Sequence, residues 1–273
     1  MSSDYLGQLT DSLAHDSFHP DDSGDVYVKT CDAEDLMGHN ERHVYSGLGP
    51  HPRILKCLNP TDWTIPIAER VSPNEPLRFP KAPKGDLQQY LWNHPDPPFP
   101  LRVKWIHQIA EGLEFIHTKG FFWADCTPAN MLLTNNLDIL LCDFGASTLI
   151  TERAFGVLPG LYMKPGADFS GDYFRSTKVD IYAFGCVVLE LITHGVIDAE
   201  TEAWNPEFFR GGHTYPDSGF LLIDLIPTSL VPFKAIVESC WDLYYPDGRQ
   251  LFAAVKDACT QYESETQSSA NVE

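Results

Sequence analysis

The most informative part of this chain runs Trp123-Ala124-Asp125-Cys126-Thr127-Pro128-Ala129-Asn130, then through a short apolar segment to Asp143-Phe144-Gly145. The segment between them predicts two short strands joined by a polar turn at Asn135-Asn136, a residue type that tolerates left-handed backbone angles. Such a hairpin brings Asp143 back beside Asn130, so that amide and carboxylate oxygens converge as a hard cation such as magnesium requires. Asp125 lies in the loop before the hairpin, where its carboxylate can face a substrate hydroxyl.

This pattern resembles the catalytic domain of protein kinases. The resemblance implies an α+β fold of two lobes, a small antiparallel β-sheet lobe with one helix and a larger, mainly helical lobe. It also implies that Asp125 is the catalytic base, that Asn130 and Asp143 bind magnesium, and that ATP is the phosphate donor. Asp-Phe-Gly alone is a common turn, so the prediction depends on the three residues occurring together and in this order.

The resemblance extends upstream to a lysine and a glutamate. Residues 26–29 read Val-Tyr-Val-Lys, which alternates as a strand does, and Lys29 matches the kinase lysine that contacts the α- and β-phosphates. A solvated lysine at a strand end is the ordinary alternative. Glu41 lies in a predicted helix that ends near Gly49 and matches the glutamate that holds this lysine. Glu34 is the competing glutamate, but it lies too close to the strand.

Residues 77–87 resemble the hinge between the two kinase lobes. The resemblance makes Phe79 the gatekeeper and places the backbone of Pro80 and Ala82 against the edge of the adenine. Pro80 has no N–H, but that position has to supply only its carbonyl, and Ala82 has the N–H donor. The predicted nucleotide-binding residues are therefore Lys29, Phe79, Pro80, Ala82 and Asp143.

Two apolar segments predict helices in the large lobe. Residues 101–117 carry a helical stripe, and kinases place such a helix directly before the catalytic loop. Residues 178–192 resemble the buried central helix of the large lobe, in which Asp180 matches the aspartate that caps the backbone of the catalytic loop. A membrane span is excluded there by length and by acidic residues. Arg249 matches a late kinase arginine, for which Asp168 is the candidate partner.

The expected organisation is a single protein kinase domain. The small lobe is placed at residues 1–82, with 1–24 degenerate, the large lobe at 83–264, and a disordered tail at 265–273. Strand-like runs at 51–58 and 63–68 are expected to complete the small sheet.

The chain departs from the kinase pattern in its glycine-rich loop and in its catalytic loop. Only Gly7 and Gly24 precede Lys29, where kinases have three spaced glycines. Trp123 and Ala124 replace the usual His and Arg, and Thr127 replaces the lysine of serine/threonine kinases; the tyrosine-kinase pattern is also absent. Because that Arg normally pairs with a phosphorylated activation loop, phosphomimetic changes at Ser147, Thr148 and Thr151 are expected to leave activity unaltered.

Three functions are compatible with these residues. The preferred one is an ATP- and magnesium-dependent protein kinase that transfers the γ-phosphate to a protein hydroxyl, serine or threonine, at a low rate. A pseudokinase that acts as a binding or scaffolding module is the alternative, because the glycine-rich loop and three catalytic-loop residues depart from the pattern. A small-molecule phosphotransferase of the aminoglycoside or choline type ranks last, since those enzymes seldom carry Asp-Phe-Gly.

Composition limits the partners and the cellular compartment. A formal net charge of −19 disfavours nucleic acids and anionic membranes, which attract Lys and Arg. Seven scattered cysteines without close pairs are typical of reduced thiols, so a cytoplasmic or nuclear protein is expected rather than one with disulfides or a zinc site. The polar start of the chain predicts no signal peptide. ATP is the one partner the sequence indicates; the protein substrate is not readable, and a monomer is the default expectation.

Overall fold

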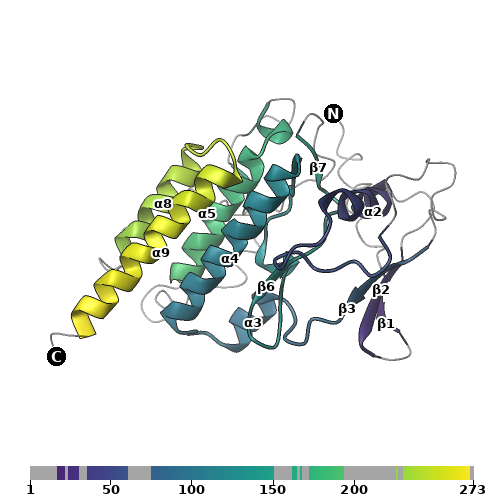
Figure 1. Cartoon of the computed structure of the whole chain (residues 1–273), viewed down its shortest axis with the longest axis horizontal. Coiled ribbons are helices and arrows are strands. Elements are labelled where there is room, and N and C mark those ends of the chain that lie inside the picture. Colours follow the sequence, from purple (N-terminus) through teal and green to yellow (C-terminus); the bar gives the residue numbers. More distant parts are fainter. Residues whose placement is uncertain are drawn as a thin grey trace, which may run out of the picture.

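The computed structural model describes residues 17–21, 24–30, 36–60, 75–150, 162–164, 167, 172–193, 226 and 230–270. A small antiparallel sheet with one helix lies on one side of the molecule, and a larger group of helices lies on the other (Figure 1). The chain therefore has the two-part α+β architecture that the sequence predicts.

The small lobe is a three-stranded sheet with one helix beside it. Its strands β1 (Ser17–Pro20), β2 (Val26–Thr30) and β3 (Leu77–Pro80) pair antiparallel in that order. Lys29 lies in the central strand, opposite Phe18 and Leu77. The helix α2 (Leu36–Leu48) ends at Gly49, whose φ of +71° is the left-handed conformation that glycine adopts at helix ends.

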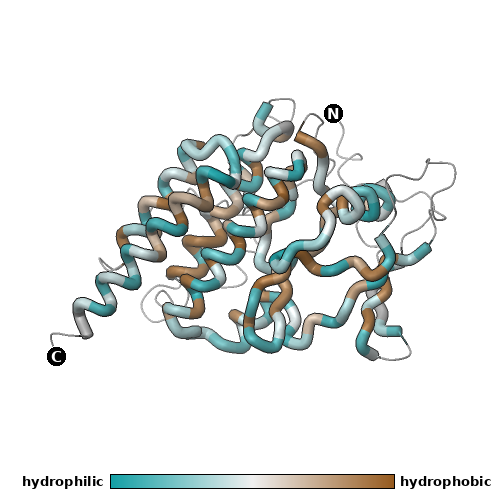
Figure 2. Tube along the Cα trace, viewed as in Figure 1, coloured by the Kyte–Doolittle hydropathy of each residue, from teal (hydrophilic) through white to brown (hydrophobic). Residues whose placement is uncertain are grey.

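The large lobe consists mainly of helices that pack on one another. They are α3 (Leu87–Asn93), α4 (Phe99–Thr118), α5 (Lys178–Thr193), α8 (Val231–Trp241) and α9 (Gly248–Ala270), with a short 3₁₀ turn η4 (Asp172–Arg175) before α5. α4 packs against α9, and α5 packs against α8. The hydrophobic segments in Figure 2 run through these packed helices and the neighbouring short strands.

α5 is the centre of the large lobe. Every residue from Val179 to Thr193 is buried, which explains why the segment reads as a nearly continuous apolar run. At Gly185 an added Cβ would lie 2.7 Å from the Cβ of Cys240, so this glycine is what lets α5 and α8 approach closely.

Short strands position the loops of the site between the lobes. The hairpin of β5 (Met131–Leu133) and β6 (Ile139–Leu141) is antiparallel, as predicted. It follows the 3₁₀ turn η2 (Pro128–Asn130). A second pair joins β4 (Phe121–Phe122) to β7 (Thr148–Leu149).

Three local predictions were wrong. Residues 51–58 do not join the small sheet; this segment runs beside β6, where Leu55 N–H donates to the carbonyl of Leu141 and Leu141 N–H to that of Arg53. In the hairpin turn the left-handed residue is Leu137 (φ +57°) rather than Asn135 or Asn136.

The third wrong prediction concerns the disordered tail at 265–273: residues 265–270 are helical, and 271–273 lie outside the described residues. α9 continues to Ala270, and its last turns are supported by local side-chain bonds, among them Gln261 Nε2 to Glu265 Oε1 at 2.9 Å. Of the segment 1–24, predicted to be degenerate, residues 17–20 form β1. The run 63–68, Glu34, Gly7, Thr151 and Asp168 lie outside the described residues.

Candidate active site

Lys29, Glu41 and Asp143 meet between the lobes. Lys29 Nζ lies 2.7 Å from Oε2 of Glu41 and 3.3 Å from Oδ1 of Asp143. Lys29 and Glu41 are almost fully buried, at 2% and 1% exposure, whereas the side chain of Asp143 is 38% exposed. The solvated-lysine alternative for Lys29 is therefore wrong, because the ammonium group is enclosed by two carboxylates.

Glu41 also contacts the backbone after Asp143. Its Oε1 accepts a hydrogen bond of 3.2 Å from the N–H of Phe144. Burial raises the pKa of Glu41 to about 7, against the opposing effect of the positive charge on Lys29. Glu41 thus connects α2, β2 and the Asp143-Phe144-Gly145 segment through a single buried carboxylate.

Asp125 and Asn130 form a second pair. Asn130 Nδ2 donates to Oδ2 of Asp125 at 2.8 Å and to its backbone carbonyl at 3.1 Å. Oδ1 of Asp125 is buried and has no hydrogen-bond partner among the described residues. Burial, followed by the negative charge of Asp143, raises the pKa of Asp125 to about 7. A carboxylate with one unused oxygen and a pKa near neutrality is suited to accept a proton.

The catalytic loop is anchored by Asp180 from α5. Its two carboxylate oxygens accept the N–H groups of Trp123 and Ala124, each at 2.7 Å, and Oδ2 lies 2.9 Å from Nε2 of His117. Nδ1 of His117 in turn accepts the N–H of Gly248 at 2.8 Å. This anchor holds Ala124 at φ +65°, a backbone angle that a residue with a Cβ seldom adopts.

Trp123 has a positioning contact that sequence reasoning missed. Its indole Nε1 donates to the carbonyls of Cys142 and Asp143, at 3.1 and 3.0 Å. Asp143 has φ +55°, so these bonds hold a backbone conformation that is unfavourable for aspartate. The sequence marks Trp123 only as a departure from the usual histidine. The donor on its ring was the signal that could have indicated this contact.

A cavity of about 370 Å³ lies between these residues and the hinge. Its lining includes Phe79, Pro80 and Ala82 from the hinge side and Glu41, Asn130 and Asp143 from the polar side. Phe79 is buried and packs on Tyr45 of α2, with ring centroids 5.2 Å apart. Apart from Lys29, the predicted nucleotide-binding residues all line this cavity. Lys29 contacts Glu41 and Asp143, which are both in the lining of the cavity.

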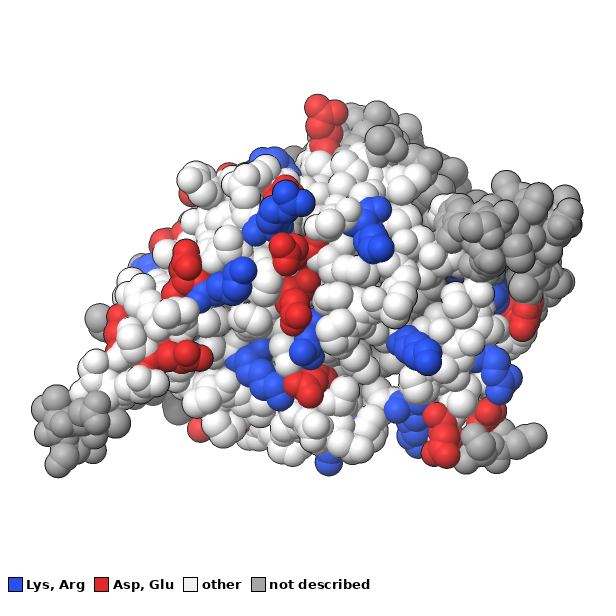
Figure 3. Space-filling model, viewed as in Figure 1, with Lys and Arg blue, Asp and Glu red and all other residues white. Residues whose placement is uncertain are grey.

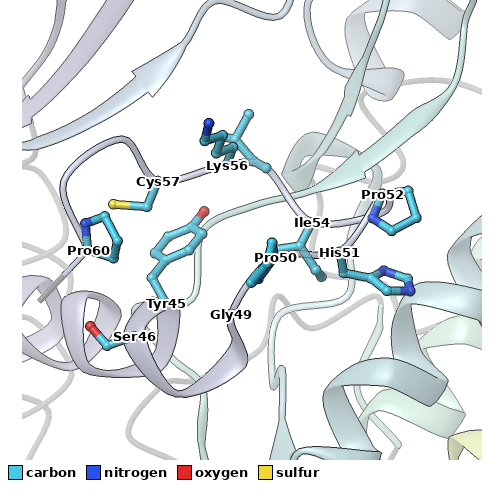
Figure 4. Close-up of a pocket in the computed structure, with 11 residues that line it drawn as sticks. Tyr45, Ser46, Gly49, Pro50, His51, Pro52, Ile54, Lys56, Cys57 and Pro60 are labelled. Carbon is cyan, nitrogen blue, oxygen red and sulfur yellow. The ribbon is translucent and has the colours of Figure 1, made fainter. Parts of the chain in front are cut away.

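A second cavity, of about 720 Å³, lies between α2 and residues 49–60 (Figure 4). Tyr45 and Leu55 line both cavities, so the two cavities lie next to each other. The ring of Tyr45 also packs edge-on against Phe144 at 5.0 Å.

The oxygens at the cavity suit a magnesium ion that is bound mainly through phosphates. Nδ2 of Asn130 is used toward Asp125, and no hydrogen bond among the described residues uses its Oδ1. With the partly exposed carboxylate of Asp143, this gives two hard oxygen donors, the number that magnesium typically takes from a protein when it also binds a nucleotide. The described residues contain no group of three or more His, Cys, Asp or Glu that could hold a metal without such a ligand.

Ser147 and Thr148 are buried, which changes the expectation that acidic replacements there leave activity unaltered. Ser147 is fully enclosed and its Oγ donates to the carbonyl of Trp123 at 2.8 Å, while Thr148 is 2% exposed. A phosphate or an acidic replacement there would bury a charge, so these substitutions should destabilise the site rather than leave it unaltered.

The surface shows charges of both signs. On the face in Figure 3, Lys and Arg lie among Asp and Glu across the middle of the molecule. Ion pairs that the structure contains include Arg53–Glu111 and Lys104–Asp138. The six cysteines that the structure describes are all free thiols. None of the described helices is long and apolar enough to span a membrane.

Comparison with known proteins gives consistent matches. A family model for the protein kinase domain matches residues 32–205. A probable serine/threonine-protein kinase from Dictyostelium discoideum is 39% identical over 119 residues, covering 42% of this chain and 28% of that protein. The probable serine/threonine-protein kinase CST from Arabidopsis thaliana is 34% identical over 182 residues, covering 62% and 41%. Another serine/threonine-protein kinase from that plant is 28% identical over 213 residues, covering 70% and 41%. The matched part is less than half the length of each of these relatives.

Proposed function

The chain belongs to the protein kinase domain family, and from that premise we propose that it transfers the γ-phosphate of ATP to a protein hydroxyl, with magnesium as cofactor. Serine or threonine is the proposed acceptor, since the relatives above are named serine/threonine-protein kinases. The observation that carries the proposal is the convergence of Lys29, Glu41, Asp143 and the Asp125–Asn130 pair at one cavity.

Each residue has a proposed task in the transfer. Asp125 orients the acceptor hydroxyl and receives its proton at the unpartnered Oδ1. Lys29, held by Glu41, places its ammonium group against the phosphates. The hinge backbone at Pro80 and Ala82 faces the adenine, with Phe79 behind it.

Magnesium would be held by Asn130 and Asp143 through their oxygens. When bound, the ion neutralises the charge of the triphosphate. Trp123 binds the carbonyl before Asp143 and Glu41 binds the N–H after it, so the backbone is held on either side and this carboxylate is ready for the ion.

Thr127 favours the pseudokinase alternative. It is buried at the position where serine/threonine kinases carry a lysine, and its hydroxyl supplies no positive charge. Loss of one such stabilising group typically lowers the rate by about 10²–10³-fold, so we propose slow transfer rather than none.

The melting temperature with ATP or ADP, with and without magnesium, tests nucleotide binding. At a ligand concentration of 100 times Kd, binding should stabilise the fold by about 2.7 kcal/mol. We expect a magnesium-dependent increase in wild type that is lost in Asp143→Asn and kept in Asp172→Asn, an exposed carboxylate in η4. No increase at millimolar nucleotide would refute the kinase proposal and favour the binding module.

Transfer to protein substrates is the second step of the test. Radiolabelled ATP and a mixture of basic and generic protein substrates are used with wild type and Asp125→Asn. Incorporation by wild type, reduced at least about 100-fold in the variant, supports the assignment of the base. Equal incorporation by both proteins would refute it.

A further inference from the structure

We propose that Asn40 is a positioning residue that latches α2 to the backbone after Asp143, and that this latch forms without phosphorylation. The inference deepens the proposed function and rests on it. It concerns the segment 144–148, here called the post-Asp143 segment, and its contacts with α2.

Asn40 uses one amide group for two backbone carbonyls. Its Nδ2 donates to the carbonyl of Gly145 at 2.8 Å and to that of Ser147 at 2.5 Å. The residue directly precedes Glu41, whose Oε1 accepts the N–H of Phe144. Two adjacent side chains of α2 thus bind one donor and two acceptors of the post-Asp143 segment. A movement of α2 away from this segment would break all three bonds.

The other side of the segment is held by the catalytic loop. Ser147 Oγ donates to the carbonyl of Trp123, the residue whose N–H is bound by Asp180. The segment is therefore fixed between α2 and α5 by hydrogen bonds that involve no phosphate. Gly145, Ser147 and Trp123 are buried and Asn40 is partly buried, so these bonds are partly shielded from competing water.

Ala124 completes the latch with apolar packing. Its side chain forms a small buried cluster with Phe122 and Ala146, and Met37 of α2 packs against this cluster. In Gly145 an added Cβ would lie 3.5 Å from Cβ of Met37, which shows how closely α2 approaches the segment. The kinase pattern has at the position of Ala124 an arginine that pairs with a phosphate. In this chain Ala124 instead takes part in an apolar contact with Met37 of α2.

The latch matters because it holds the Lys29–Glu41–Asp143 arrangement. Asp143 has a left-handed backbone, so the residues after it must be restrained if its carboxylate is to stay at the cavity. Asn40 supplies that restraint from the same helix that carries Glu41. The chain therefore keeps its ion cluster assembled in the unphosphorylated state.

Hydrogen exchange of Asn40→Asp tests the latch directly. Aspartate has nearly the same shape but cannot donate, and its charge faces two carbonyl oxygens. We expect the amides of residues 144–148 to exchange at least about tenfold faster, with amides of α5 unchanged. Asn135→Asp, in an exposed turn, introduces the same charge and should change neither. Asn40→Ala serves as a second, uncharged variant should the aspartate prevent folding.

Kinetics and phosphatase treatment complete the test. Asn40→Ala should lower kcat about tenfold or more with little change in the KM for the protein substrate, because the acceptor site is not altered. Phosphatase treatment of wild type should leave exchange at 144–148 unchanged.

The latch is overturned if exchange at 144–148 is the same in wild type and both Asn40 variants, or if phosphatase raises it in wild type. Absence of transfer by wild type would refute the proposed function instead, since the exchange measurement needs no activity.

Discussion

The two sides of the site are held by different kinds of contact. On the large-lobe side, Asp180 binds the main-chain N–H groups of Trp123 and Ala124, so this anchor does not depend on their side chains. On the small-lobe side, Lys29, Glu41 and Asp143 hold one another through their side chains. The chain thus departs from the kinase pattern at Trp123 and Ala124, whose main chain is the anchored part, and keeps it at Lys29, Glu41 and Asp143, whose side chains make the contact.

Asp180→Asn should break the backbone anchor and have the largest effect on stability. One amide NH₂ would face a main-chain N–H in a fully buried site, leaving donors unsatisfied. We expect the free energy of unfolding to fall by roughly 3–5 kcal/mol. Urea denaturation followed by tryptophan fluorescence measures it, with Asp172→Asn as the exposed control. A loss below about 1 kcal/mol would mean that the loop does not need this anchor.

Glu41→Gln should break the side-chain contact and lower both activity and stability. The glutamine carbonyl can still accept the N–H of Phe144, but the ion pair with Lys29 is lost. We expect turnover to fall about 10²-fold, the usual effect of losing one positioning group. The free energy of unfolding should also fall, by roughly 3 kcal/mol, because the ammonium group of Lys29 stays buried and keeps only Asp143 as a carboxylate partner.

Steady-state kinetics and urea denaturation of the same preparations separate these effects. Glu111→Gln, which removes a surface ion pair with Arg53, is the matched control and should leave turnover unchanged. A Glu41→Gln variant that loses stability but keeps its turnover would reverse the comparison between the two sides.

Glu190 is a third buried carboxylate, and its effect on stability can be measured through its dependence on pH. Its partner is the hydroxyl of Tyr162, at 2.7 Å, and burial raises its pKa from 4.5 to about 7. Between these two values the folded state binds a proton that the unfolded state releases. The carboxyl therefore stabilises the fold fully below pH 4.5, and this contribution is lost as pH rises to about 7.

Glu190→Gln should remove this pH dependence. We expect the variant to exceed wild type in stability at pH 8 by roughly 3 kcal/mol, and the difference to shrink toward pH 4.5. Denaturation at a series of pH values measures it, with the exposed Glu238→Gln as control. A constant difference across this range would show that Glu190 does not titrate there.

Trp123→Phe should have the smallest effect of the four. The N–H of the main chain stays on Asp180, whereas the indole donor to the carbonyls of residues 142 and 143 is lost. We expect a loss of about 1 kcal/mol in stability. The magnesium-dependent increase in melting temperature should decrease, since Asp143 is held less firmly; an unchanged increase would contradict the contact's role.

Much of the architecture could be predicted because its signals are local. The hairpin before Asp143, the helix carrying Glu41 and the buried α5 follow from turn residues, a glycine stop and an apolar run. Residues 51–58 were mispredicted because strand propensity does not specify a partner, and here the partner is β6. The length of α9 was missed since polar composition is compatible with both a surface helix and a disordered chain.

The long-range contacts of the site could be predicted only in part. The contact of Asp180 with the catalytic loop could be predicted, because both the aspartate and the loop match a recognisable pattern in the sequence. Asn40 and Trp123 show in sequence only that they carry an N–H donor, and their partners are backbone carbonyls, which any sequence would supply. Burial of Ser147 likewise depends on how α2 packs over it.

His117 connects the helix α9 to the catalytic loop through hydrogen bonds. Its two ring nitrogens join Gly248, the first residue of α9, to Asp180, and Gly248 can come so close to α4 only because it has no Cβ. A load applied along α9 would therefore reach the catalytic loop through a few hydrogen bonds. Surface immobilisation or a force probe attached to the end of this helix would pull on the loop itself, whereas attachment at the β1–β2 turn would load the small sheet instead.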